Sequence, residues 1–237
     1  MTFRERLLET LREIQSILAV DGVMVIGSEV PNLLEPGAAS TLVVSQDVDI
    51  GVPVARLAEV KRRVARLATF RPAAEEPSVM VPLDIRLIEV NFLGIDPTIT
   101  LASETYVLED PQLPLLVFGT LSHLRPAAPT EVAGVRLVLP RPAGLIIEKL
   151  LTDRSGVKGE RDLLVALALL MVSSEADLRE LSEQYRELVA DLRYAVRANL
   201  ALLSLLPPVP GMPDPRPQRA RVADVLQHLE KSEEDLA

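Results

Sequence analysis

The clearest structural signal in this chain is an apolar, β-branched run at positions 42–52 that carries polar side chains at three alternate positions. Side chains alternate between the two faces of a β-strand, so this pattern predicts a strand with one polar and one apolar face. The polar face carries Ser45, Asp47 and Asp49.

The hydrophobic pattern predicts helices on both sides of this strand. Residues 3–20 and 53–67 carry apolar side chains at helical spacing, and residues 98–103 are expected to form a short helix. Residues 115–118 are predicted to form a buried strand, and residues 131–139 a hairpin that turns at Gly134.

Residues 79–93 form a second β-rich segment, in which the alternation changes phase. The apolar set is first Leu83, Ile85 and Leu87, and then Ile88, Val90 and Phe92. Because a strand cannot exchange its two faces without a bulge or bend, the phase change predicts one of these near Leu87 and Ile88.

The pattern becomes helical after residue 140, and three domains are predicted: residues 1–140, 141–206 and 207–237. Residues 141–206 read as a helical bundle that includes one long helix from residue 177 to 206. The prolines of residues 207–217 exclude helix and predict an extended linker. Residues 219–236 are a terminal helix that either docks on its own chain or exchanges with a partner in a homodimer. The predicted fold class is α+β, a mixed β-sheet flanked by helices and followed by this bundle.

Composition narrows the chemistry and the partners. The 237 residues include no cysteine and two histidines, so a metal site would use oxygen ligands. The net charge of −9 disfavours an extended nucleic acid as partner. Neither a signal peptide nor an apolar run long enough to span a membrane is recognisable, which predicts a cytoplasmic protein.

Asp47 and Asp49 are the first candidate for chemistry. Two carboxylates at successive positions on one face repel each other and suit a hard divalent cation such as Mg²⁺. On the pair alone, a solvated strand face is the simpler interpretation. Upstream, Gly27 and Ser28 end a short apolar strand, where glycine allows close approach of a ligand and serine can donate to a phosphate.

Together these residues resemble the signature of the nucleotidyltransferase superfamily, a Gly-Ser pair followed by an acid-hydrophobic-acid strand. The resemblance covers residues 22–92, and more loosely 132–170. It implies that Gly27 and Ser28 contact the triphosphate of a nucleotide, and that Asp47 and Asp49 bind Mg²⁺ together with a third acid from a later strand. The long gap between the two motifs departs from compact members of the family and predicts an inserted loop.

The third acid is expected from residues 79–93, where Asp84 is our first choice and Glu89 the alternative. Family members often carry this acid in a hydrophobic-acid-hydrophobic-Leu setting, which matches residues 90–93 and places Asn91 where an acid is expected. The amide favours the interpretation that the site has no third acid.

Four cations cluster in the first part of the helical region, at Lys149, Arg154, Lys158 and Arg161, beside Asp162. The segment is similar to one found in the AbiEii-like branch of the superfamily. Lys149 is predicted to face the site and bind phosphate. A charged helical hairpin that keeps the chain soluble explains the same residues equally well.

The resemblance implies Mg²⁺-dependent transfer of a nucleoside monophosphate from a nucleoside triphosphate to an acceptor hydroxyl. Asp47, Asp49 and Asp84 would hold the metal ions. The acceptor is open between a small molecule, a protein and RNA. The alternative is a non-catalytic protein of the same fold that binds a nucleotide or a partner protein.

Overall fold

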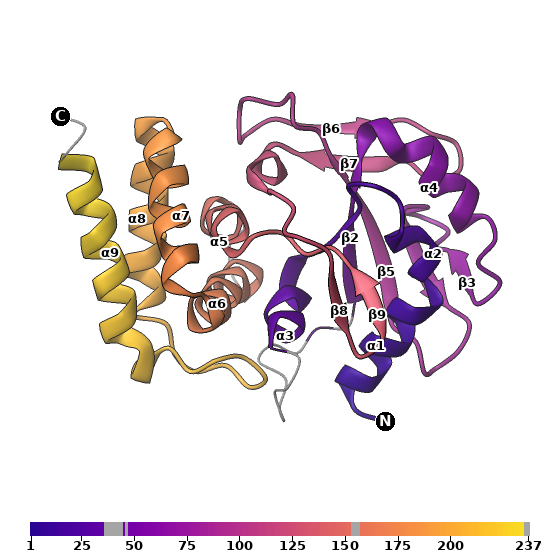
Figure 1. The fold of residues 1–237 in the computed structure, drawn as a ribbon, viewed down its shortest axis with the longest axis horizontal. Coiled ribbons are helices and arrows are strands. Elements are labelled where there is room, and N and C mark those ends of the chain that lie inside the picture. The colour runs from indigo at the N-terminus through magenta and orange to yellow at the C-terminus, as the bar shows by residue number, and fades with distance from the viewer. Residues whose placement is uncertain (36–44, 46, 153–156, 235–237) are drawn as a thin grey trace. The chain divides into compact units, whose positions relative to one another are not determined.

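The computed structural model describes residues 1–35, 45, 47–152 and 157–234 (Figure 1). The chain divides into two compact units, Met1–Pro140 and Arg141–Ala237. The first unit contains a mixed β-sheet flanked by helices, and the second is helical, which confirms the predicted α+β class.

The sheet of the first unit is organised around β5 (Glu89–Ile95). One edge of β5 pairs in parallel with β2 (Asp47–Pro53) over the full length of both strands. The other edge pairs antiparallel with β4 and, further along, parallel with β7. The remaining sheet strands are β1 (Met24–Ile26), β3 (Phe70–Pro72), β4 (Val79–Pro82), β6 (Thr105–Leu108) and β7 (Leu115–Phe118).

The two faces of the sheet differ in polarity, as the alternation predicts. Val48, Ile50 and Val52 of β2 are fully buried on one face. Helices α1 (Phe3–Glu13), α2 (Gln15–Leu18) and α4 (Leu57–Val64) lie along the sheet (Figure 1). The predicted helix over residues 3–20 is therefore two helices, which meet at Ile14.

The predicted hairpin is confirmed as β8 (Thr130–Val132) paired with β9 (Val135–Leu137). Its two turn residues both have positive φ angles, 49° at Ala133 and 81° at Gly134. Two successive residues in this region form the type of turn that matches the twist of a hairpin. Immediately after β9, the Val138 carbonyl accepts a hydrogen bond of 3.0 Å from the Val25 amide and closes the outer edge of β1.

Two predictions for the first unit are wrong. Residues 79–95 form two antiparallel strands, β4 and β5, joined by a turn, in place of the predicted single strand with a bulge or bend. The change of phase marks the turn, in which Ile85 is 89% exposed. Residues 98–103 form no helix, because the Asp96 carboxylate accepts hydrogen bonds from the Thr98 amide and hydroxyl, which stabilise a turn.

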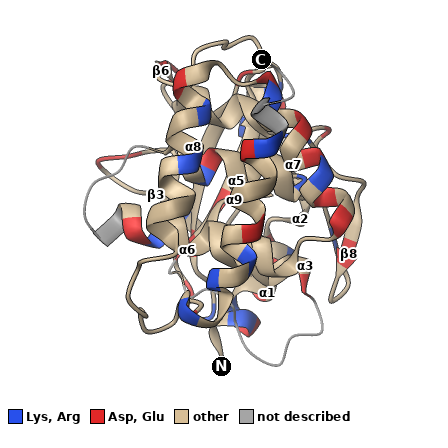
Figure 2. Ribbon diagram, turned by 90° about the vertical axis from the view of Figure 1, so that its left-hand side faces the viewer, with Lys and Arg blue, Asp and Glu red and all other residues tan. Residues whose placement is uncertain are grey.

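The second unit is built around α5 (Pro142–Leu151), which packs against α6 (Val157–Val172), α7 (Glu175–Glu187) and α8 (Ala190–Leu203). The predicted long helix over residues 177–206 is thus two helices, separated at Leu188 and Val189. The terminal helix α9 (Arg219–Glu234) packs on α7 and α8 of its own chain. Acidic and basic residues are interspersed along these helices (Figure 2). None of the helices in the described ranges is long and apolar enough to cross a membrane.

Candidate functional site

The polar side chains of β2 and β5 meet on one face of the sheet. The parallel register places Asp47 beside Glu89 and Asp49 beside Asn91. Register partners in neighbouring strands project from the same face, so the four polar side chains form one cluster. All four are half-buried, whereas the residues that alternate with them are buried in the core.

The side-chain amide of Asn91 holds the two aspartates together. Its Nδ2 group donates to Asp47 Oδ2 at 2.8 Å and to Asp49 Oδ1 at 3.2 Å. Asp47 also accepts a hydrogen bond of 2.5 Å from the Ser45 hydroxyl. Asn91 and Ser45 thus fix the carboxylates side by side through neutral donors, which add no positive charge to the cluster.

Gly27 lies directly against this cluster. Ile26 is the register partner of Asp49, and Gly27 follows it with a φ of 81° at the start of a 3₁₀ turn, Gly27–Glu29. A Cβ atom at Gly27 would lie 2.3 Å from Asp49 Oδ2, which no side chain can tolerate without displacing the carboxylate. Glycine is therefore required both by the backbone conformation and by the aspartate. Ser28, the second residue of the motif, is half-buried in the same turn.

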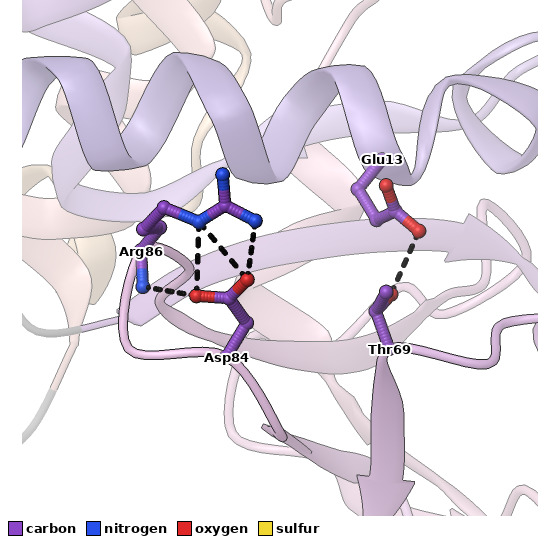
Figure 3. A network of polar contacts seen from close by, with 4 residues as sticks. All are labelled: Glu13, Thr69, Asp84 and Arg86. Atoms are coloured by element: carbon purple, nitrogen blue, oxygen red, sulfur yellow. Dashed lines mark hydrogen bonds and ion pairs between the residues drawn. The ribbon is translucent and has the colours of Figure 1, made fainter.

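Asp84 does not lie on the strand beside the pair, which corrects our first choice for the third acid. It lies in the turn after β4, where Arg86 donates to its carboxylate through Nε and Nη2 at 2.6–3.1 Å (Figure 3). The Arg86 amide adds a further hydrogen bond of 2.9 Å. These donors lower the pKa of Asp84 to about 2. The residue forms a local ion pair at the surface, close to the Glu13–Thr69 hydrogen bond.

Glu89, the alternative third acid, occupies the face of the sheet that carries the pair. Burial raises the pKa of its carboxyl group, and the negative charges of Asp47 and Glu76 raise it further. The structure therefore brings Glu89 and Asn91, rather than Asp84, next to Asp47 and Asp49. The sequence does not indicate that Glu76 lies close enough to raise the pKa of Glu89, because Glu76 lies before β4 and belongs to no recognisable motif.

Lys149 is buried within the second unit, with 7% of its surface exposed. Its Nζ atom lies 3.2 Å from Glu148 Oε2 and 3.4 Å from Asp162 Oδ1, and both acids are also buried. The lysine thus neutralises two carboxylates of α5 and α6, an arrangement that differs from the predicted phosphate ligand facing the site. The side chains of Arg154 and Lys158 lie outside the described part of the chain.

The oxygen atoms of the site suit Mg²⁺ carried by a nucleotide better than a cation held by protein alone. Within the described residues, no three His, Cys, Asp or Glu side chains are arranged to hold a metal ion. Mg²⁺ is commonly bound by one or two carboxylates together with substrate phosphates and waters. Asp47 and Asp49 provide such a pair, and Gly27 packs directly against the Asp49 carboxylate on one side of it. The residues present therefore fit the ion.

Comparison with known proteins gives a structural likeness but no relative in sequence. No family model matches the sequence, and no curated protein matches it. Among solved structures, the chain is similar to an antigenic nucleotidyltransferase-like protein from Paracoccidioides brasiliensis. The two share 12% sequence identity with a TM-score of 0.49, and the match covers 96% of this chain and 94% of the other.

Proposed function

We propose that the polar face of β2 and β5 binds the Mg²⁺ complex of a nucleoside triphosphate. The observation that carries the proposal is the paired carboxylate arrangement of Asp47 and Asp49, closed on one side by Gly27. The Gly-Ser pair and the acid-hydrophobic-acid strand were predicted as two motifs far apart in sequence. Antiparallel pairing of β1 with β2 brings them together.

Each residue has a distinct part in this proposal. Asp47 and Asp49 would ligate the ion, and Ser45 and Asn91 hold the two carboxylates in place. Gly27 would let the phosphates approach the backbone, where Ser28 offers an amide and a hydroxyl. When bound, Mg²⁺ neutralises phosphate charge and orients the triphosphate.

Binding is favoured over nucleotidyl transfer because an amide stands at the position where the family resemblance implies a third acid. Asn91 Nδ2 faces the aspartate pair, and Asp84 is engaged by Arg86 in a surface turn. A two-carboxylate site can hold one ion that is also bound by phosphates, whereas transfer by two metal ions requires further negative ligands. Our conclusion is a non-catalytic protein of this fold that binds a nucleotide.

Nucleotidyl transfer is the second candidate, and the position of Glu89 favours it. Glu89 is the register partner of Asp47 and supplies a third carboxylate to the same face. Burial is the main cause of the raised pKa of Glu89 and the charge of Asp47 adds to it, so a cation bound between the two carboxylates would bring that pKa down. If the protein catalyses nucleotidyl transfer, Glu89, rather than Asp84, is the third metal-binding carboxylate beside Asp47 and Asp49.

Calorimetric titration with ATP, GTP, CTP and UTP, with and without Mg²⁺, tests the binding proposal. We expect Mg²⁺-dependent binding of at least one nucleotide, lost in Asp47→Asn and in Asp49→Asn. Asp84→Asn is the matched control, because it removes an equal charge from the same unit and should bind as the wild type does. Equal binding by wild type and Asp47→Asn would refute the proposal.

A second assay separates binding from transfer. Wild type, Glu89→Gln and Asn91→Asp are incubated with the bound nucleotide, and release of pyrophosphate is measured against candidate acceptor hydroxyls. We expect no release from the wild type, in line with binding alone. Release that depends on Glu89 would establish the second candidate.

A further inference from the structure

The two polar atoms of the Asn91 side chain differ in their hydrogen bonding. Both N–H bonds of Nδ2 are directed at the aspartate pair, at 2.8 Å and 3.2 Å. Its Oδ1 atom is buried and has no hydrogen-bond partner among the described residues. A buried acceptor without a donor costs about 1–3 kcal/mol, so the amide has adopted an orientation that sacrifices its oxygen to satisfy the carboxylates.

The neighbouring strands explain where each atom points. Asn91 is paired with Asp49 of β2 on one side and with Val79 of β4 on the other. Nδ2 is turned toward β2, and on the β4 side the register partner is an apolar valine, whose side chain offers Oδ1 no donor. The backbone of Asn91 is fixed by both strands, so only the terminal amide is free to rotate.

The reverse orientation of the Asn91 amide, with Oδ1 toward the aspartates, is unfavourable only as long as no cation is present. It would place a carbonyl oxygen beside two carboxylates, and the three oxygens would repel one another. A divalent cation reverses that preference, since hard cations bind carboxylate and amide oxygens and reject N–H groups. The χ2 torsion of asparagine is broad and roughly two-fold, so rotation of the amide demands little strain.

We propose that Asn91 is a rotatable substitute for the cation: its Nδ2 group bridges Asp47 and Asp49 in the free protein, and its Oδ1 becomes a third oxygen ligand when a divalent cation binds. This inference rests on the proposed function, because it assigns a role to Asn91 within the same Mg²⁺ site. It makes Asn91 a ligand in one state and a positioning residue in the other.

Nuclear magnetic resonance of the full chain tests the rotation directly. The Asn91 side-chain NH₂ resonances are identified by their loss in Asn91→Asp. In the free protein these protons should show nuclear Overhauser contacts to the β-protons of Asp47 and Asp49. Addition of MgCl₂ together with ATP, with KCl and ATP at equal ionic strength as control, should abolish those contacts and produce new ones to the Val79 methyl groups.

The outcomes separate this inference from the proposed function. If Mg²⁺ shifts the Asp47 and Asp49 resonances in wild type but not in Asp47→Asn, while the Asn91 contacts stay unchanged, the rotation is wrong and the metal site stands. If Mg²⁺ shifts neither aspartate, with or without ATP, the metal site and the rotation both fail. The rotation itself is measured on the wild-type protein. The Asn91→Asp variant is used only to assign resonances and Asp47→Asn only as a control, so the test remains valid even if the Asn91 variant folds poorly.

Discussion

The two units of this protein each hold a pair of like charges close together, and they compensate those charges differently. In the helical unit, Glu148 and Asp162 are buried and flank the ammonium of Lys149. On the sheet of the first unit, Asp47 and Asp49 are half-buried and flank the neutral amide of Asn91. The helical cluster contains its own cation, and the hydrogen bonds described for the aspartate pair come from an amide and a hydroxyl.

This difference indicates which cluster is structural and which is available to a ligand. A buried carboxylate pair needs a permanent cation, since desolvation makes an uncompensated charge in the interior very costly. A half-buried pair can rely on solvent and on hydrogen bonds from an amide, and it keeps its negative charge for an external cation. The sequence motifs alone assigned both clusters to one site, whereas their compensation assigns only the first-unit cluster to binding.

The largest effect should come from removing the internal cation. Lys149→Met leaves two buried carboxylates without compensation and should lower the free energy of unfolding by about 3–5 kcal/mol. Chemical denaturation followed by circular dichroism measures it. The matched control is Lys61→Met, whose half-buried ion pair with Asp110, at 2.7 Å, should contribute at most about 1 kcal/mol. Similar losses in both variants would show that burial does not distinguish the Lys149 cluster.

The next effect concerns the glycine beside Asp49. Gly27→Ala and Gly134→Ala both place a side chain at a φ of 81°, which should cost about 1–2 kcal/mol in each variant. A Cβ at Gly134 meets nothing within 4 Å, whereas at Gly27 it meets Asp49 Oδ2 at 2.3 Å. Gly27→Ala should therefore lose a further ~1–3 kcal/mol from overpacking. Of the two variants, only Gly27→Ala should weaken binding of the Mg²⁺-nucleotide. Chemical denaturation measures the stability of both variants, and calorimetry measures their nucleotide binding.

Replacement of Glu89 should have a smaller effect of opposite sign, an increase in the free energy of unfolding. Its folded pKa is raised above the ordinary 4.5, so its contribution to stability is greatest below that pH and is lost as pH rises through the raised value. Glu89→Gln does not ionise, and should be more stable than wild type at pH 7 by roughly 0.2–1 kcal/mol, the typical cost of like charges on neighbouring strands. The gain should vanish below pH 4.5. Denaturation at pH 4 and pH 7 measures this, with Glu109→Gln as an exposed control.

The smallest effect is expected at Asp84, which the Arg86 pair holds in the surface turn. The pKa of Asp84 is lowered from 3.8 to about 2, so its stabilising contribution is present above pH 3.8 and is lost as pH falls through 2. Asp84→Asn should change stability little at pH 7, because the pair is solvent-exposed. Acid titration of both proteins should show that the difference between them disappears near pH 2. A clear loss of nucleotide binding in this variant would return Asp84 to the site.

The sequence predicted those parts of the site that depend on one strand or one turn. Alternation placed Asp47 and Asp49 on the polar face of β2, and the glycine motif placed Gly27 at the end of β1, as the structure shows. The register between strands decides which side chains of β5 lie beside these residues. Register is a property of the folded sheet and cannot be read from one strand alone. The setting of Asn91 between Val90 and Phe92 was the one local signal that pointed to its position correctly.

The failures arise where tertiary context overrides a local pattern. Asp84 lies in an alternating stretch that resembles a strand, but its pairing with Arg86 two residues later favours a turn. Lys149 lies in a cationic segment, and its actual partner Asp162 comes from the next helix. Helix spacing cannot show which charges on two successive helices will meet. The two charged groups therefore had to be located in space before their roles could be separated.

The closure of β1 by Val138 bears on how this protein is made on the ribosome. The N-terminal strand of the first unit finds its outer partner only near the end of that unit, in the Val25–Val138 hydrogen bond. A nascent chain that has not yet reached this residue exposes an open strand edge, which is a template for pairing with other polypeptides. The sheet is thus completed late in translation rather than strand by strand, and chaperone protection would matter most for chains that stall before residue 138.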